Sequence, residues 1–111
     1  MTRFAWLALS VLLVTPLFAG EPLSPERESE LRNLLIQDCG SCHGLKLRGG
    51  LGPALLPQHL HGKSAEYLSL VILEGRRGTA MPGWRALLSP AEAQWMADML
   101  LRGAVAGEND S

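Results

Sequence analysis

Residues 38–44 read DCGSCHG, and this stretch holds both cysteines of the 111-residue chain. Two residues separate Cys39 from Cys42, and His43 follows directly. C-x-x-C-H is the attachment signature of c-type haem, because two thiols at this spacing reach the two vinyl groups of one porphyrin. The adjacent imidazole can then supply the proximal iron ligand. We therefore predict one haem c, bound covalently through Cys39 and Cys42 and ligated by His43.

Three other interpretations of the cysteine pair are weaker. A thioredoxin-type redox pair belongs in a strand–helix–strand setting that the sequence does not indicate. A zinc site needs a second ligand pair at comparable spacing, and the sequence contains none. A structural disulfide stays open, although closing so short a loop removes little entropy from the unfolded chain.

The first 20 residues have the composition of a cleaved export signal. Arg3 gives a short basic region, residues 4–14 form an apolar run too short to span a bilayer, and Ala19 and Gly20 provide small residues for cleavage. An uncleaved membrane anchor is the alternative. We predict a signal peptide over residues 1–20 and one domain over residues 21–111, placed in the oxidising periplasm.

The predicted domain is small and has few large aromatic side chains. Beyond residue 20 the chain keeps only Tyr67, Trp84 and Trp95. A core of this size is marginal unless a staple, a metal or a bulky apolar cofactor supports it. The cysteine motif is the place where such a group would attach.

The capping signals predict three helices and no strands. Each helix opens with a serine N-cap, the third in a capping box with Glu92, and their predicted extents are Ser24 to about Gln37, Ser64 to Gly75, and Ser89 to Arg102. The long glycine- and proline-rich loops between them show no alternating apolar pattern. The predicted fold is therefore all-α, with helices and ordered loops wrapped around one haem.

Met81, in the loop GTAMPGW, is the predicted sixth iron ligand. A histidine paired with a loop-borne methionine is a known cytochrome arrangement that raises the reduction potential. His59 and His61 are the rivals, since imidazole binds iron strongly. Met96 and Met99 fall inside the third predicted helix, where methionine usually fills gaps in the core.

Two further residues are candidates for haem contacts. A ligating histidine usually donates its second ring N–H to an acceptor, and the carbonyl of Pro53 is our candidate for that acceptor. An ordinary turn proline is an equally simple interpretation. Trp84, three residues after Met81, is expected to pack against the porphyrin edge or in the core.

With these residues in place, the chain resembles the class I monohaem cytochromes c. The resemblance covers nearly all of residues 21–111, and it assigns the haem to Cys39, Cys42, His43 and Met81, with the Pro53 carbonyl behind the histidine. In that family an aromatic contact joins the first and last helices. In this chain Trp95 of the last predicted helix is the one aromatic residue available for that contact, and the first predicted helix has none. We therefore expect Leu31, Leu34 or Leu35 to complete the contact.

More narrowly, GSCHGLKLRGGLGPALLP and EGRRGTAMPGWRALLSPAEAQW are similar to the NirC-type cytochromes. These accompany the dissimilatory nitrite reductase of the cytochrome cd type. The resemblance implies a periplasmic electron carrier in denitrification. Its redox partners would be that reductase or the proteins that mature its special haem.

The charge pattern fits a redox partner better than a nucleic acid. The net charge is −1, yet residues 43–88 carry a net +4. A basic rim around an exposed haem edge would steer the molecule toward an acidic partner. A slightly acidic, exported chain does not suit nucleic acid. After signal removal we expect no membrane contact, and we expect a monomer.

These features predict an electron carrier and not an enzyme. With a ligand on each iron face, a substrate cannot reach the metal. No serine–histidine–acid arrangement, carboxylate pair or phosphate loop offers another chemistry. The alternative is a haem protein with a labile or open sixth position that binds a small gas or peroxide.

Overall fold

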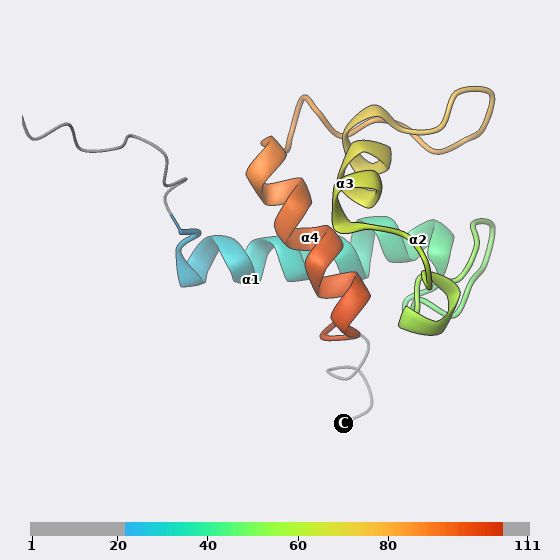
Figure 1. Ribbon diagram of the computed structural model, residues 1–111, viewed down its shortest axis with the longest axis horizontal. Coiled ribbons are helices and arrows are strands. Elements are labelled where there is room, and N and C mark those ends of the chain that lie inside the picture. The colour runs from blue at the N-terminus through green and yellow to red at the C-terminus, as the bar shows by residue number, and fades with distance from the viewer. Residues whose placement is uncertain (1–21, 106–111) are drawn as a thin grey trace, which may run out of the picture.

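The computed structural model describes residues 22–105, in which the regular secondary structure is helical and no strand is present. The predicted signal peptide lies outside the described residues. The elements are α1 (Pro25–Leu34), η1 (Leu35–Cys39), α2 (Gly40–His43), η2 (Pro57–His59), α3 (Ala65–Glu74) and α4 (Pro90–Arg102). The segments α1, η1 and α2 follow one another without a break, so residues 22–105 form three main helical segments (Figure 1). The predicted all-α fold is confirmed.

The three predicted helix starts are present as capped ends. Ser24, Ser64 and Ser89 each accept a hydrogen bond from the backbone N–H three residues later, at 3.1 Å. At α4 the Glu92 carboxylate also accepts from the Ser89 backbone N–H, which completes the capping box. Short polar side chains thus satisfy backbone donors that the first helical turn leaves without partners.

The core forms where α4 meets the other two helical segments. α3 packs against α4, and α1 crosses α4 at an angle that Figure 1 shows clearly. The buried side chains are almost all aliphatic or methionine, and the fully buried large ones are Leu31, Leu35, Leu47, Met96 and Val105. Met96 and Met99 are therefore core residues, as predicted. No described helix is both long enough and apolar enough to cross a bilayer.

The crossing of α1 and α4 uses an arginine in place of a second aromatic ring. The Arg32 guanidinium lies over the Trp95 ring, 5.6 Å from its centroid, and Leu31 and Leu35 are completely buried in the core cluster against which Trp95 packs. The leucines complete the contact as expected, but a cation–π interaction covers the tryptophan. Arginine supplies both a long aliphatic stem and a flat charged end at this position.

A second arginine also joins these two helices. Arg27 binds Glu92 of the α4 capping box and, at 2.8 Å, Glu30 of its own helix. Partial burial raises the pKa of Glu92, but its hydrogen bonds from Arg27 and Ser89 outweigh that effect and leave the pKa lowered. The start of α4 is therefore tied electrostatically to α1.

α3 ends at the glycine that the sequence predicts, but with a backbone conformation that is unusual for a helix end. Gly75 has the positive φ expected of a helix-terminating glycine, at 71°, but its ψ of −168° is extended and not left-handed helical. The chain therefore leaves α3 extended, toward Met81, instead of curling back on the helix. Gly103, at the end of α4, has φ 66° and ψ 19°, the left-handed conformation common at helix ends.

Candidate functional site

A cavity of about 680 Å³ lies between the cysteine motif, the loop that follows it, α3 and the loop before α4. Clefts that bind small molecules and cofactors usually have volumes of about 300–1,000 Å³, so a space of this size can hold a bound group. Most of the lining side chains are apolar, among them Leu35, Leu55, Leu60, Leu68, Val71, Ile72 and Leu100. The bound group should therefore itself be bulky and largely apolar.

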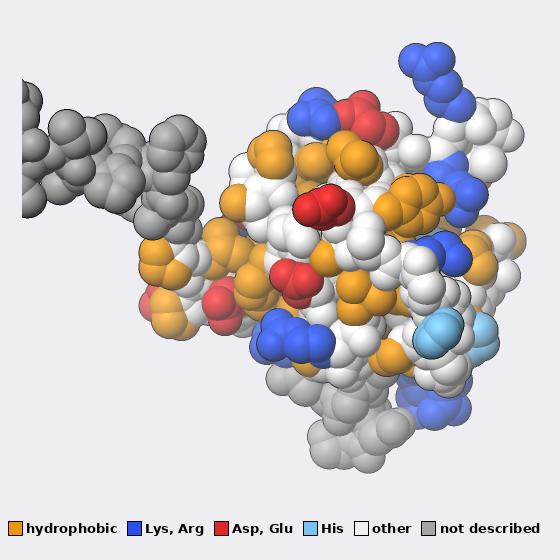
Figure 2. Space-filling view, viewed as in Figure 1, with side chains coloured by type: hydrophobic (Ala, Val, Ile, Leu, Met, Phe, Trp, Pro, Cys, Tyr) orange, Lys and Arg blue, Asp and Glu red, His pale blue; other side chains and the backbone are white. Residues whose placement is uncertain are grey.

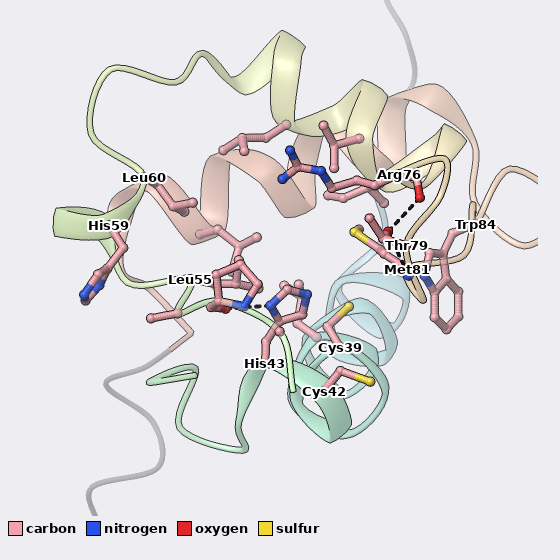
Figure 3. Close-up of a pocket in the computed structure, with 18 of the residues that line it drawn as sticks. Cys39, Cys42, His43, Leu55, His59, Leu60, Arg76, Thr79, Met81 and Trp84 are labelled. Carbon is pink, nitrogen blue, oxygen red and sulfur yellow. Dashed lines mark hydrogen bonds between the residues drawn. The ribbon is translucent and has the colours of Figure 1, made fainter. Parts of the chain in front are cut away.

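The cysteine motif forms one wall of this cavity. The π-helical turn η1 brings an extra residue into the helix just before the motif, and α2 then carries Cys42 and His43. Cys39, Cys42 and His43 all line the cavity and lie together in Figure 3. No disulfide joins Cys39 to Cys42.

The two thiols have different surroundings. Cys42 is exposed, whereas Cys39 is partly buried. Burial, with a smaller contribution from the negative charge of Asp38, raises the pKa of Cys39 to about 11. Cys39 therefore stays a thiol at neutral pH, which keeps it a weak nucleophile toward disulfides before any haem is attached.

His43 is oriented by a backbone carbonyl. Its Nδ1 lies 2.7 Å from the Pro53 carbonyl oxygen, and this is the contact that the sequence predicts for Pro53. A carbonyl only accepts hydrogen bonds, so Nδ1 carries the proton and donates. Nε2 is then left with its lone pair, the form that binds a metal.

The backbone of Gly52 packs closely against the same His43 imidazole ring. A Cβ built on Gly52 would lie 2.8 Å from both Cε1 and Nδ1 of His43, closer than such atoms come in proteins. Only glycine leaves room for the imidazole there. The sequence shows the glycine in GLGP, but its contact with His43 depends on how the loop folds back, which spacing does not reveal.

Met81 lies in the opposite wall, and its sulfur faces the cavity in Figure 3. The rival ligands are placed differently. His59 lines the cavity, but its ring points away from His43, and His61 is exposed and does not line the cavity. Trp84 lies at the cavity wall beside Met81, and its packing against a porphyrin edge stays a prediction. The structure thus brings Cys39, Cys42, His43, Met81, Pro53 and Trp84 to one cavity.

Comparisons with known proteins identify the family of the chain. A family model described as "Cytochrome C oxidase, cbb3-type, subunit III" matches residues 26–100. The chain is 50% identical over 103 residues to cytochrome c55X of Pseudomonas aeruginosa, spanning 91% of this chain and 87% of that one. The chain belongs to the c-type cytochromes. The predicted relation to this family, and not to an enzyme family, is confirmed.

Two further relatives place the cytochrome more narrowly. The solved structure of a c-type cytochrome NirC superposes with a TM-score of 0.74 at 52% identity, covering 76% of this chain and 99% of that one. A dihydro-heme d1 dehydrogenase of Pseudomonas aeruginosa is 38% identical over 91 residues, which are 82% of the cytochrome but 17% of that protein. The cytochrome is thus of the NirC type and also resembles a small part of the dehydrogenase.

The cavity of the cytochrome fits the haem c that its family implies. It is apolar, it has thiols and a correctly protonated imidazole on one wall, and it has a thioether on the other. Haem also carries two carboxylates, and two basic residues, Lys63 and Arg76, line the cavity. Neither forms an ion pair with another residue in the range 22–105. In Figure 3 the Arg76 guanidinium reaches into the cavity.

We predict that Gly52→Ala disturbs the His43 side of this site. The added methyl group must displace the imidazole, so the free energy of unfolding of the haem-loaded protein should fall by about 1–3 kcal/mol. Its visible spectrum and reduction potential should change as well. Chemical denaturation and redox titration measure these effects.

Gly62→Ala is the matched control. A Cβ at Gly62 meets no atom within 4 Å, although its φ of +81° makes alanine strained by about 1–2 kcal/mol. It should lower stability without changing the spectrum or the potential. A Gly52→Ala protein with both properties of the wild type would show that His43 does not depend on this glycine.

Proposed function

We propose that the cytochrome is a periplasmic single-electron carrier of the nitrite reductase system. In this proposal Cys39 and Cys42 bind one haem c covalently, and His43 and Met81 are its axial ligands. The observation that carries the proposal is the placement of a thioether and a pre-oriented imidazole in opposite walls of one apolar cavity. The periplasmic location rests on the signal predicted over residues 1–20.

The protein groups around the cavity suit electron transfer without bond chemistry. The bound haem would supply a one-electron couple. His43 is fixed by Pro53 and Gly52, so its ring has little freedom to move between oxidation states. The apolar lining excludes water and, together with a methionine ligand, favours the reduced state and a higher potential. With both axial positions filled, the protein leaves no place for a substrate at the metal.

The relatives suggest where the electrons come from or go. The name of the dihydro-heme d1 dehydrogenase describes a reaction that removes two electrons from its substrate. A carrier with one haem accepts one electron in each encounter, so two encounters would complete each turnover. The likeness between the cytochrome and part of that enzyme supports a place beside it in haem d1 maturation. The nitrite reductase itself is the other partner that we propose.

The structure changes the predicted account of the basic rim. Of the six basic residues in 43–88, Lys63 and Arg76 line the cavity, and Arg85 binds Glu74. All six are exposed, and we assign docking to Lys46, Arg48 and Arg77, which do not line the cavity. In Figure 2, basic side chains and histidines gather on the right, whereas most acidic side chains lie at the centre and left.

Met81→Ala tests the proposed ligation. The wild-type ferric protein should show the weak far-red absorption band of thioether-ligated haem, and its ferrous form should not bind CO readily. Met81→Ala should lose the band, bind CO and have a reduction potential lower by on the order of 0.1 V, within the range that axial ligands set.

His59→Ala and His61→Ala are the controls and should keep the band and the potential. If His59→Ala lost the wild-type spectrum while Met81→Ala kept it, the histidine would be the ligand. If the wild type bound CO as readily as Met81→Ala, the alternative of a gas- or peroxide-binding haem protein would replace the carrier.

Electron exchange with the two proposed partners tests the placement in the nitrite system. In stopped-flow experiments, the ferrous cytochrome should reduce the cytochrome cd-type reductase, or the ferric cytochrome should accept electrons from the dehydrogenase working on dihydro-haem d1. Because basic residues would steer the encounter, the rate should fall about tenfold from low to high salt. A rate independent of salt would contradict the basic docking face, and exchange with neither partner would contradict the placement.

A further inference from the structure

The chain crosses itself immediately beside Met81. After α3 it runs out as a long loop and returns across the end of that helix before α4 begins (Figure 1). Three backbone hydrogen bonds join the two passes: Arg76 N–H donates to the Met81 carbonyl at 3.2 Å, Trp84 N–H to Ile72 at 3.0 Å, and Arg85 N–H to Leu73 at 3.2 Å. Residues 72–76 and 81–85 therefore lie side by side.

Two glycines meet at the centre of this crossing, one on each pass. A Cβ on Gly75 would lie 2.6 Å from the Gly83 nitrogen and 2.7 Å from the Met81 carbonyl oxygen. A Cβ on Gly83 would lie 2.6 Å from the Leu73 carbonyl oxygen. All of these neighbours are backbone atoms, so no side-chain rotation relieves the overlap. We call Gly75 and Gly83 the glycine crossing.

The two glycines are required for different reasons. Gly75 has a φ of +71°, which favours glycine whatever its surroundings. Gly83 does not have a positive φ, so its backbone conformation is open to any residue. Only the close approach of α3 explains a glycine at position 83. A substitution at Gly83 therefore tests the close contact with α3 without adding backbone strain.

The crossing holds the Met81 backbone from both sides. The Met81 carbonyl accepts from Arg76 N–H at 3.2 Å, and its own N–H donates to the Thr79 hydroxyl at 3.3 Å. That hydroxyl donates in turn to the Arg76 carbonyl at 2.6 Å. The buried side chains of Leu68 and Ile72 anchor α3 in the core. The hydrogen bonds to Arg76 therefore fix the position of Met81 relative to the packed helices.

We infer that the glycine crossing is a positioning device that sets how far the Met81 sulfur reaches into the cavity. This inference rests on the proposed function, in which that sulfur is the sixth ligand. A thioether is a weak, neutral ligand, so a displacement of a few tenths of an ångström weakens its bond to iron. Widening the crossing by one methyl group pushes residues 81–83 away from α3 and takes Met81 with them.

The experiment compares Gly83→Ala with Gly78→Ala in the haem-loaded protein. Gly78 lies in the same loop and has a φ of +75°, but a Cβ there meets no atom within 4 Å. Gly78→Ala thus adds backbone strain to the loop without touching the crossing. The readouts are the far-red band of the ferric protein, the reduction potential and the concentration of added imidazole that displaces the sixth ligand.

Gly83→Ala should weaken or abolish the band, lower the potential and lower the imidazole concentration needed for displacement by about tenfold or more. Gly78→Ala should stay within about twofold of the wild type in imidazole affinity and keep the band. A Gly83→Ala protein with the band and imidazole affinity of the wild type overturns the inference. A wild-type protein without the band overturns the Met81 ligation itself, so the two failures are distinguishable.

Thr79→Val is the second test of whether the loop positions Met81. It is used if the Gly83→Ala protein cannot be obtained in its haem-loaded form. This variant removes the hydroxyl that accepts from the Met81 N–H and donates to the Arg76 carbonyl, and it adds no overlap at the crossing. It should lower the displacing imidazole concentration several-fold and leave the His43 side of the site unchanged. Imidazole affinity equal to that of the wild type would show that the loop does not position Met81.

Discussion

The structure depends on a space that the chain does not fill with its own side chains. A cavity of about 680 Å³ separates the cysteine motif from α3 and from the Met81 loop. Without a bound group, the apolar side chains that line this partly open cavity would lose packing partners and face water, which is unfavourable in proportion to the apolar area left exposed. The helices therefore form a frame whose stability rests on the group bound within it.

Backbone atoms and glycines, more than charged side chains, arrange the two proposed ligands. On one wall, the Pro53 carbonyl and the bare Gly52 backbone confine the His43 ring. On the other, the close passage of Gly75 and Gly83 confines Met81. Backbone groups held in a packed fold move less than long side chains do, which suits a carrier whose ligands must stay in place in both oxidation states.

The sequence predicted the features that depend on local chemistry. Ser24, Ser64 and Ser89 mark helix starts because a short hydroxyl side chain satisfies nearby backbone donors. The spacing of Cys39, Cys42 and His43 predicts their common placement. It could not show the contacts that depend on how distant parts of the chain approach each other: Gly52 against His43, Gly83 against α3, and Arg32 over Trp95. The direction of the His59 ring, which points away from His43, is of the same kind. The extended ψ of Gly75 belongs with these, because the returning loop decides it.

One sample tests the central claim most directly: the protein produced in a periplasm with a haem-attachment system, characterised by its intact mass and visible spectrum. The account predicts a red protein heavier than its bare polypeptide by one haem, with the added mass retained after denaturation because thioether bonds hold it. A colourless protein with the mass of the bare chain, obtained while the attachment system loads another c-type cytochrome in the same cells, would contradict it.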